Sequence, residues 1–251
     1  MGGVSFDPDS VERAAFVQGA RHDAFVLPWR RPRRAQFVQV VDGVLSVRTE
    51  DGLCVAPPHH GIWVLRDVLH GMSSATPVVL CILYADANAV PVPSRCCVMA
   101  VDGLMDELLA AASQFAPHAP LTGEESRLMA VIADRLPRLT EAGLSLIYPR
   151  DPRARHIADT LTADPGNAGV LDDFAVQASI TARTAARLFT KETGLTFGQW
   201  RQQLRLLTAL TRLGAGASVT QVALDVGYSD VSSFIAVFKD ALGETPARFF
   251  R

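Results

Sequence analysis

The apolar positions in the last hundred residues follow a helical pattern, and the pattern occurs twice. Four positions recur with a spacing of 49 residues: Phe189, Gly194, Thr196 and Trp200 correspond to Phe238, Gly243, Thr245 and Phe249. In each copy a short amphipathic segment, 171–178 or 219–226, leads through a turn into a second helix that ends at the glycine. The repeat predicts two helix-turn-helix units.

In the first unit the sequence predicts a helix that is capped by Thr181 and runs to Thr193. Gly194 can adopt the left-handed conformation that ends a helix. One face turns three apolar residues to the core: Ala185, Leu188 and Phe189. The opposite face carries Arg183, Ala186, Arg187 and Thr190, with Thr184 beside them near the start of the helix.

In the second unit Gly227-Tyr228 forms the turn, and either Ser229 or Asp230 caps a helix to Leu242. We expect Phe234, Val237 and Phe238 to point inward. The outward positions are Ser232, Ser233, Ile235, Ala236 and Lys239. Position 236 corresponds to Arg187 of the first unit.

Leucines at helical spacing predict one long helix between the units, from Trp200 to Leu213, ended by Gly214 and Gly216. Such a helix can hold two DNA-binding units at a fixed separation. Binding to successive major grooves on one face of a duplex requires a separation of roughly 34 Å.

The N-terminal half shows the alternation and turn residues of β structure over 24–85. Segments 36–41 and 44–49 flank Asp42-Gly43, which predicts a hairpin. Further strands are expected at 53–56, 62–65 and 78–84. Closely spaced short strands are typical of a small barrel or sandwich.

Two helical patterns follow, at 101–115 and 128–139, with Thr122 and Glu125 at capping-box spacing. Their apolar faces are expected either to pack on the barrel or to form a homodimer interface. Residues 148–152 resemble a linker because both prolines disfavour a helix. The sequence thus predicts an α+β multidomain protein: a barrel at 1–95, a helical segment at 96–149 for packing or dimerisation, and an all-α domain at 150–251.

Composition agrees with a chain of two ordinary domains. The 251 residues are 49% hydrophobic, and no run approaches the roughly 18 apolar residues needed to span a membrane. Met1 to Asp9 has acidic residues where a signal peptide has basic ones, so we expect a cytoplasmic protein without membrane contact. The four cysteines show no metal-ligand or disulfide spacing.

The charge distribution is compatible with DNA binding in the C-terminal part. Residues 153–251 carry 11 Lys and Arg against 9 Asp and Glu, whereas residues 1–152 are net acidic. Because the excess is small, DNA affinity must come from a few well-placed side chains. Arg183 and Arg187 lie one turn apart, and a guanidinium can donate two parallel hydrogen bonds to guanine or to a phosphate. The alternative is an ordinary solvated helix face, but the repeated context favours DNA contact.

Several C-terminal motifs resemble the signature of the AraC/XylS family of bacterial transcription regulators. These are Lys191-Glu192-Thr193-Gly194, Phe197-Gly198-Gln199-Trp200-Arg201, Arg205-Leu206, Val222-Ala223, Gly227-Tyr228, Phe234, Phe238 and Pro246. The resemblance implies a two-headed DNA-binding domain, commonly joined to an effector-binding or dimerisation domain. It also implies promoter binding that activates or represses transcription. The sequence does not tell which of the two effects occurs.

Matched by motif, the family's base-contacting positions fall on Arg183, Ala186 and Arg187, and on Val231, Ser232 and Ala236. The second unit lacks an arginine equivalent to Arg187. We therefore expect it to bind through hydroxyls, amides at the helix start and apolar contacts with thymine methyls. The resemblance further implies RNA polymerase and a second copy of the chain as partners, besides double-stranded DNA.

The N-terminal half resembles the cupin barrels attached to many members of this family. The positions of the cupin metal ligands fall on Gln36 and on the pairs Trp29/Arg31 or Arg30/Pro32, and only His70 could bind a metal. We therefore expect no metal, no cofactor and no enzymatic activity. The barrel is expected to enclose a small-molecule effector or to dimerise. Candidate lining residues are Trp29, Gln36, Trp63 and His70.

Three other functions stay open at this point. A metal-dependent cupin enzyme with an added DNA-binding domain would need bound metal. A DNA-alkyl repair protein would need a zinc-binding cysteine cluster near the N-terminus, where the first cysteine is Cys54. A protein-interaction module would use the helical repeat without DNA.

Overall fold

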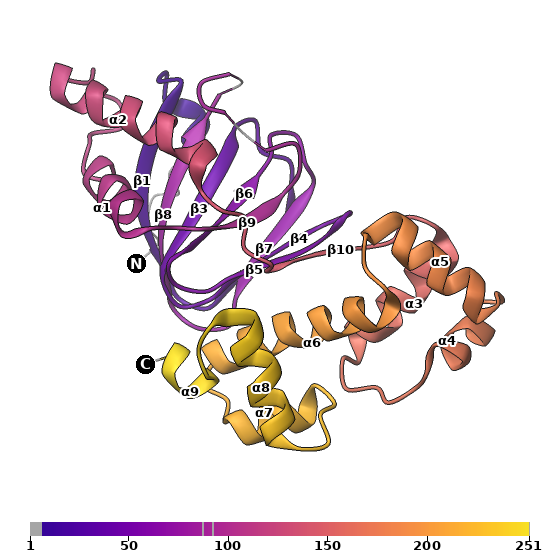
Figure 1. Cartoon of the computed structure of the whole chain (residues 1–251). Helices are drawn as coiled ribbons and strands as arrows, with labels where there is room; N and C mark the ends of the chain where they lie inside the picture. The colour runs from indigo at the N-terminus through magenta and orange to yellow at the C-terminus, as the bar shows by residue number, and fades with distance from the viewer. Residues whose placement is uncertain (1–6, 87, 92, 251) are drawn as a thin grey trace. The chain divides into compact units, whose positions relative to one another are not determined.

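The computed structural model describes residues 7–86, 88–91 and 93–250 (Figure 1). Residues 1–6, on which the expectation of no signal peptide partly rests, lie outside the described residues. Internal contacts divide the chain into two compact units. The first comprises Met1–Val47 and Ala56–Ala142, and the second comprises Arg48–Val55 and Gly143–Arg251.

The first sheet is antiparallel and has the strand order β1-β8-β3-β6-β9. Its strands are β1 (Ala15–His22), β3 (Ala35–Asp42), β6 (His60–Val64), β8 (Val78–Ala85) and β9 (Cys97–Ala100). Cys81 of β8 lies opposite Gly19 of β1 and also opposite Gln39 of β3. The register therefore places these three residues side by side on one face of the sheet.

The second sheet has the strand order β10-β5-β4-β7-β2. Its strands are β2 (Phe25–Arg30), β4 (Leu45–Thr49), β5 (Gly52–Ala56), β7 (His70–Ser74) and β10 (Ser145–Ile147). β2 pairs with β7, and β10 pairs with β5, both antiparallel. Two antiparallel sheets and a helical C-terminal part confirm the predicted α+β fold class.

The predicted hairpin at Asp42-Gly43 is wrong, although the turn itself exists. β3 pairs with β6 and β8, whereas β4 belongs to the other sheet, so the turn leads the chain from one sheet into the next. Gly43 has φ +87°, and a Cβ there would lie 2.7 Å from the carbonyl oxygen of Pro77. The glycine is thus required by the turn and by the close approach of backbone, not by a hairpin.

The sequence also missed strands at both ends of the N-terminal half. β1 precedes the predicted β region, and only its first half is buried, which weakens the alternation. β9 and β10 lie within the segment predicted to be helical. β10 has only three residues, too few for a periodic signal.

The two predicted helices are present as α1 (Gly103–Ala112) and α2 (Gly123–Arg135), and the capping box between Thr122 and Glu125 is confirmed. Figure 1 shows the pair over the face of the first sheet. A shared core contains Met105, Leu109, Ala112 and Ile132 from the helices with Phe37, Trp63 and Leu83 from the strands. The buried helix faces therefore pack on the sheet. Short 3-10 turns occur at Pro8–Ser10 and Leu136–Arg138.

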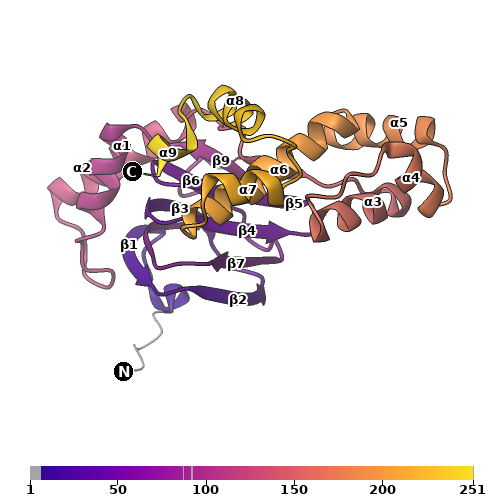
Figure 2. The same cartoon turned by 90° about the horizontal axis from the view of Figure 1, so that it is seen from below.

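The second unit contains the remaining helices, which Figures 1 and 2 show grouped around α6. They are α3 (Pro152–Ala163), α4 (Leu171–Gln177), α5 (Ala182–Thr193), α6 (Phe197–Gly214), α7 (Val219–Asp225), α8 (Val231–Leu242) and α9 (Pro246–Phe249). α6 begins three residues before the predicted start because Thr196 and Gln199 form a capping box. In the described part of the chain no helix combines the length and apolar character needed to cross a bilayer.

Gly61 of β6 provides a stability test of the first unit. A Cβ at this position would lie 2.7 Å from Cε2 of the fully buried Phe37 ring. We expect Gly61→Ala to lower the free energy of unfolding by about 1 to 3 kcal/mol because the ring must shift in a packed core. Urea denaturation of the full chain measures this change.

Gly103→Ala is the control, since a Cβ at Gly103 meets no atom within 4 Å. Equal unfolding midpoints for the two variants would show that the sheet beneath α1 is not packed as described.

Candidate nucleic-acid interface

The first helix-turn-helix unit consists of α4, a turn at Ser179, and α5. Ser179 has φ +56°, and the Thr181 hydroxyl oxygen accepts a hydrogen bond from the Thr184 amide at 3.2 Å. Gly194 ends α5 with φ +76°. Ala185, Leu188 and Phe189 are buried, as predicted from their spacing. Both the cap and the left-handed stop predicted for this helix are confirmed.

The opposite face of α5 presents cationic side chains without protein partners. Arg183 and Arg187 are exposed, and neither forms a hydrogen bond or ion pair with another described residue. The same holds for Lys191, one further turn along. These three residues, four apart, define a row that we call the α5 cation row. Thr190 is exposed, and Ala186 and Thr184 are half-buried beside the row.

Lys191 was missed as a candidate, although its spacing of four from Arg187 was visible in the sequence. In the sequence it stands out only as part of the family signature. The signal that could have found it is the continuation of the 183/187 series by one helical turn.

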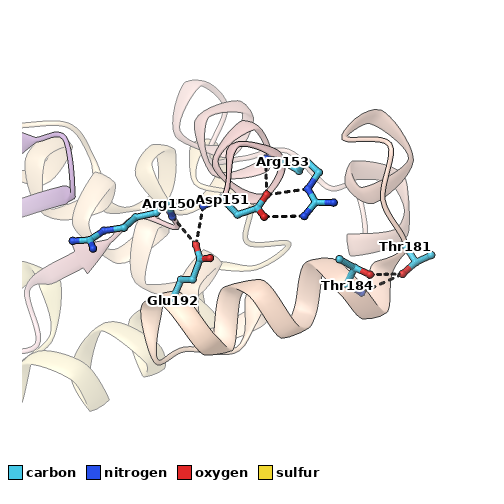
Figure 3. A network of polar contacts seen from close by, with 6 residues as sticks. All are labelled: Arg150, Asp151, Arg153, Thr181, Thr184 and Glu192. Atoms are coloured by element: carbon cyan, nitrogen blue, oxygen red, sulfur yellow. Dashed lines mark hydrogen bonds and ion pairs between the residues drawn. The ribbon is translucent and has the colours of Figure 1, made fainter.

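The acidic residue of α5, Glu192, points toward the segment that enters α3 (Figure 3). The Glu192 carboxylate accepts hydrogen bonds from the backbone amides of Arg150 and Asp151, at 2.7 and 2.9 Å. Asp151 caps α3 and receives two hydrogen bonds from the Arg153 guanidinium, which lower the pKa of its carboxyl group to about 2. Glu192 thus satisfies two backbone amides just before α3, and Asp151 neutralises the charge of Arg153 in the first turn of that helix.

The second unit repeats this backbone with different chemistry. α8 is capped by Asp230, whose carboxylate accepts hydrogen bonds from the amide and the hydroxyl of Ser233 at 2.8 and 2.6 Å. Of the two predicted caps, Asp230 is therefore the one used, and Ser229 lies exposed before it. Gly243 ends α8 with φ +80°, as Gly194 ends α5.

The exposed positions of α8 are polar or small. Ser232, Ser233, Ala236 and Lys239 are exposed, and Val231 is half-buried. Phe234 and Phe238 are buried as predicted, whereas Val237, which was expected to point inward, is only half-buried. Lys239 forms no hydrogen bond or ion pair with another described residue. The face equivalent to the α5 cation row thus carries a single cation near its end.

An aromatic core joins α5 to α6 and to the segment that precedes α3. Phe189 packs edge-on against Phe197 and Trp200, with ring centroids 5.4 Å apart in both pairs. The Trp200 indole donates a hydrogen bond to the Ile147 carbonyl at 2.8 Å, and its ring lies 5.9 Å from that of Tyr148. Tyr148 is therefore buried, and the start of the predicted linker is packed rather than free.

Two half-buried arginines of α6 hold the loops of both helix-turn-helix units. The Arg205 guanidinium donates hydrogen bonds to the carbonyls of Pro165 at 3.0 Å and Gly227 at 3.1 Å, and it lies over the Tyr228 ring. Arg201 donates to the Gly169 carbonyl at 2.8 Å. Burial lowers the pKa of both guanidinium groups.

The Arg205 contacts link the two units through one side chain. Residues 165 and 169 belong to the loop that enters α4, and residue 227 is the turn between α7 and α8. A Cβ at Gly227 would lie 2.8 Å from the Gly166 carbonyl oxygen, so the loop and the turn also touch directly. The sequence showed Arg205 only as part of the family signature, without a role.

The four candidate effector residues differ in burial, and two of them lie on opposite faces of the first sheet. Trp29 is 51% exposed on β2, whereas Gln36, Trp63 and His70 are buried. Trp63 packs against Phe37 on the face of the first sheet covered by α1 and α2. Gln36 adjoins Phe37 on β3 and therefore points to the other face. The prediction that Trp63 and Gln36 share one cavity is wrong because adjacent residues of a strand alternate between faces.

His70 is fully buried in the first unit. Its Nδ1 lies 3.0 Å from the Val68 carbonyl oxygen, and burial lowers the pKa of the imidazole. Across the described residues, no three His, Cys, Asp or Glu side chains gather in a metal-binding group.

Comparison with known proteins agrees with this geometry. A helix-turn-helix domain family matches residues 174–251. The chain is 32% identical over 246 residues to the HTH-type transcriptional regulator NimR of Escherichia coli K12, covering 97% of this chain and 90% of NimR. It is 35% identical over 101 residues to the HTH-type transcriptional regulator RipA of Corynebacterium glutamicum, covering 40% of this chain and 30% of RipA.

Among solved structures, unsaturated fatty acid-bound ToxT from Vibrio cholerae covers 96% of this chain and 96% of its own, with a TM-score of 0.41 and 10% identity. An AraC-type regulator from Chromobacterium violaceum covers 39% of this chain and 89% of its own, with a TM-score of 0.38 and 23% identity.

Two helix-turn-helix units and the full-length similarity to a transcriptional regulator define the class: the protein binds DNA and regulates transcription. Within that class, the chain belongs to the AraC family of helix-turn-helix regulators.

Replacing Arg205 tests the link between the two units. Arg205→Met keeps the aliphatic stem but leaves the carbonyls of Pro165 and Gly227 without this donor. We expect the free energy of unfolding of the helical unit to fall by about 1.5 to 3 kcal/mol, the range for hydrogen bonds to charged groups. Urea denaturation followed by circular dichroism at 222 nm measures the loss.

Arg212→Met on the same helix is the matched control, because its ion pair with Asp225 lies at the surface. That change should cost less than about 1 kcal/mol. A loss for Arg205→Met no larger than the control would contradict the proposed link.

Proposed function

We propose that this AraC-family regulator recognises operator bases mainly through α5 and uses α8 chiefly to hold the DNA backbone. The observation that carries this proposal is the α5 cation row, whose guanidinium groups are exposed and have no partner among the described residues. Most other arginines of the second unit are paired or bonded to carbonyls, including Arg153, Arg201, Arg205 and Arg212. The α5 cation row therefore has free hydrogen-bond donors and positive charge with which the second unit can bind DNA.

Within the row, Arg183 and Arg187 are proposed to donate hydrogen bonds to base edges, most favourably to guanine. They occupy the first two turns of α5, the part of a recognition helix that enters the major groove. Lys191 lies one turn further on, where an ammonium group suits a phosphate. Thr184 and Thr190 flank the row with hydroxyl groups, and Ala186 leaves space for a base.

The second unit is proposed to contribute affinity more than sequence selectivity. Ala236 stands where α5 has Arg187, so it cannot donate a hydrogen bond to a base. Ser229, Ser232 and Ser233 bring hydroxyls and backbone amides near the start of α8, and Lys239 brings one charge. Val231 suits contact with a thymine methyl. We assign Asp230 to capping, because its carboxylate is held by Ser233 and would repel phosphate.

The N-terminal unit is proposed to mediate dimerisation and response to a small molecule, with no catalytic role. Leu104 and Val131 remain exposed on α1 and α2 and favour contact with a second copy. A dimer would carry four DNA-binding units and occupy a long promoter site. We propose that it acts in the cytoplasm. Contact with RNA polymerase would activate transcription, and occlusion of its site would repress it.

Substitutions in the α5 cation row test base recognition against a cognate site obtained by selection from random DNA. We expect Arg183→Ala and Arg187→Ala each to weaken binding to that site by about 1 to 3 kcal/mol and to affect random DNA much less. Lys191→Ala should weaken both DNAs about equally and reduce the slope of log K against log salt by about 1. Electrophoretic mobility shifts at several salt concentrations measure all three.

Arg212→Ala removes one charge from α6 and serves as the control. Equal losses on cognate and random DNA for Arg183→Ala and Arg187→Ala would reduce these residues to phosphate contacts. Unchanged DNA binding by Arg183→Ala, Arg187→Ala and Lys191→Ala would show that α5 does not contact DNA.

A further inference from the structure

A pocket of about 400 Å³ lies between the first sheet and α1, within the first unit. Its lining includes Gly19, Arg21, Gln39, Cys81, Asp106 and Ser113. The strand residues come from β1, β3 and β8 and share the face of the sheet that α1 covers. Gln36 points to the opposite face of β3, and none of the four candidate effector residues lines this pocket.

The pocket exists because small residues face each other across the interface. A Cβ at Gly19 would meet only Ser113 within 4 Å, at 3.9 Å, so the space above the strand is open. Ala110 of α1 also lines it with a single methyl group. Elsewhere the same interface is filled by the core of Phe37, Leu83 and Met105. A volume of this size is within the range of small-molecule sites.

Gln39 leaves a hydrogen-bond acceptor unused at the pocket. The side chain is 1% exposed, and its Nε2 donates to the Asp106 carboxylate. Because a carboxylate only accepts, this contact fixes which end of the amide is the oxygen. No donor from the described residues reaches the Gln39 Oε1. A buried acceptor without a donor is unfavourable. The Oε1 atom is itself closed to solvent, so an N–H group on a bound molecule would reach it only after the Gln39 amide turns toward the pocket.

The other polar groups of the pocket also favour a ligand that donates. The Ser113 hydroxyl donates to the Ala110 carbonyl at 2.7 Å, and the Cys81 thiol donates to the Leu109 carbonyl at 3.3 Å. Both hydrogens are therefore already used. The Asp106 carboxylate supplies negative charge, whereas Arg21 is exposed and its charge is screened by solvent.

Covalent capture by Cys81 does not fit this environment. Burial, together with the nearby Asp106 carboxylate, raises the pKa of the thiol to about 12. The sulfur is thus protonated at neutral pH and is a poor nucleophile. Binding at this site would be reversible.

We propose that this pocket binds a small, largely apolar, planar molecule whose polar end is a cationic N–H donor such as an amidinium. The N–H groups would donate to the Gln39 Oε1 and the Asp106 carboxylate, and the apolar part would lie between Gly19 and Ala110. Its regulatory meaning rests on the proposed function: α1 carries Asp106 and Ala110 and is followed by Ser113, so an occupant would alter how α1 packs on the sheet.

Benzamidine is the probe, and isothermal titration calorimetry of the full chain without DNA is the measurement. Saturable binding with a Kd of about 1 mM or tighter is expected for a ligand of this size. Benzoate, of similar shape and opposite charge, should bind at least about tenfold more weakly, corresponding to 1.4 kcal/mol.

Ala110→Trp should abolish benzamidine binding by filling the pocket, and Ala111→Trp, at the next position of the same helix, should not. Gln39→Leu should weaken benzamidine binding at least about tenfold. If Ala110→Trp does not fold, the result for Gln39→Leu alone tests the proposal. Absence of saturable binding, equal binding by benzoate, or binding that survives both pocket variants overturns the proposal. DNA binding is measured in a separate experiment. Absence of benzamidine binding would therefore leave the proposed DNA recognition intact, and loss of the proposed DNA recognition would leave the pocket proposal intact.

Discussion

Two recognition helices can bind one duplex only if something fixes their relative position, and here that constraint is provided by α6. The helix is anchored at its start by the aromatic core of Phe189, Phe197 and Trp200. Further along, Arg205 holds the loop before α4 and the turn before α8 with one guanidinium. A rigid planar donor suits this position, because one guanidinium can donate to several carbonyl acceptors at once.

The duplication preserves the backbone and changes the chemistry. α5 and α8 have equal length, begin at side-chain caps and end at left-handed glycines. Their exposed faces differ most at the equivalent positions Arg187 and Ala236. Positions that determine the fold thus tolerate little variation between the copies, whereas positions that face solvent are free to diverge. One unit can specialise in selectivity while the other contributes affinity.

The C-terminal part was predictable because its signals are local. Helical periodicity, the cap at Thr181 and the stop at Gly194 each act within a few residues, and all were confirmed. The N-terminal sheets depend on pairing between distant strands, which the alternation of residues does not specify. The Asp42-Gly43 turn predicted adjacent strands, yet it connects two sheets. The same reason separates the effector candidates Trp63 and Gln36: whether two residues can line one cavity depends on which face each strand turns inward.

The contact of Glu192 with the amides of residues 150 and 151 has a mechanical consequence. This carboxylate sits near the end of α5 and is bonded to the segment through which the chain enters α3. A displacement of that segment therefore acts on the end of α5 through Glu192, and on the aromatic core through Ile147 and Tyr148. The helix that we propose to contact bases is thus held at its C-terminal end by the segment through which the chain enters α3.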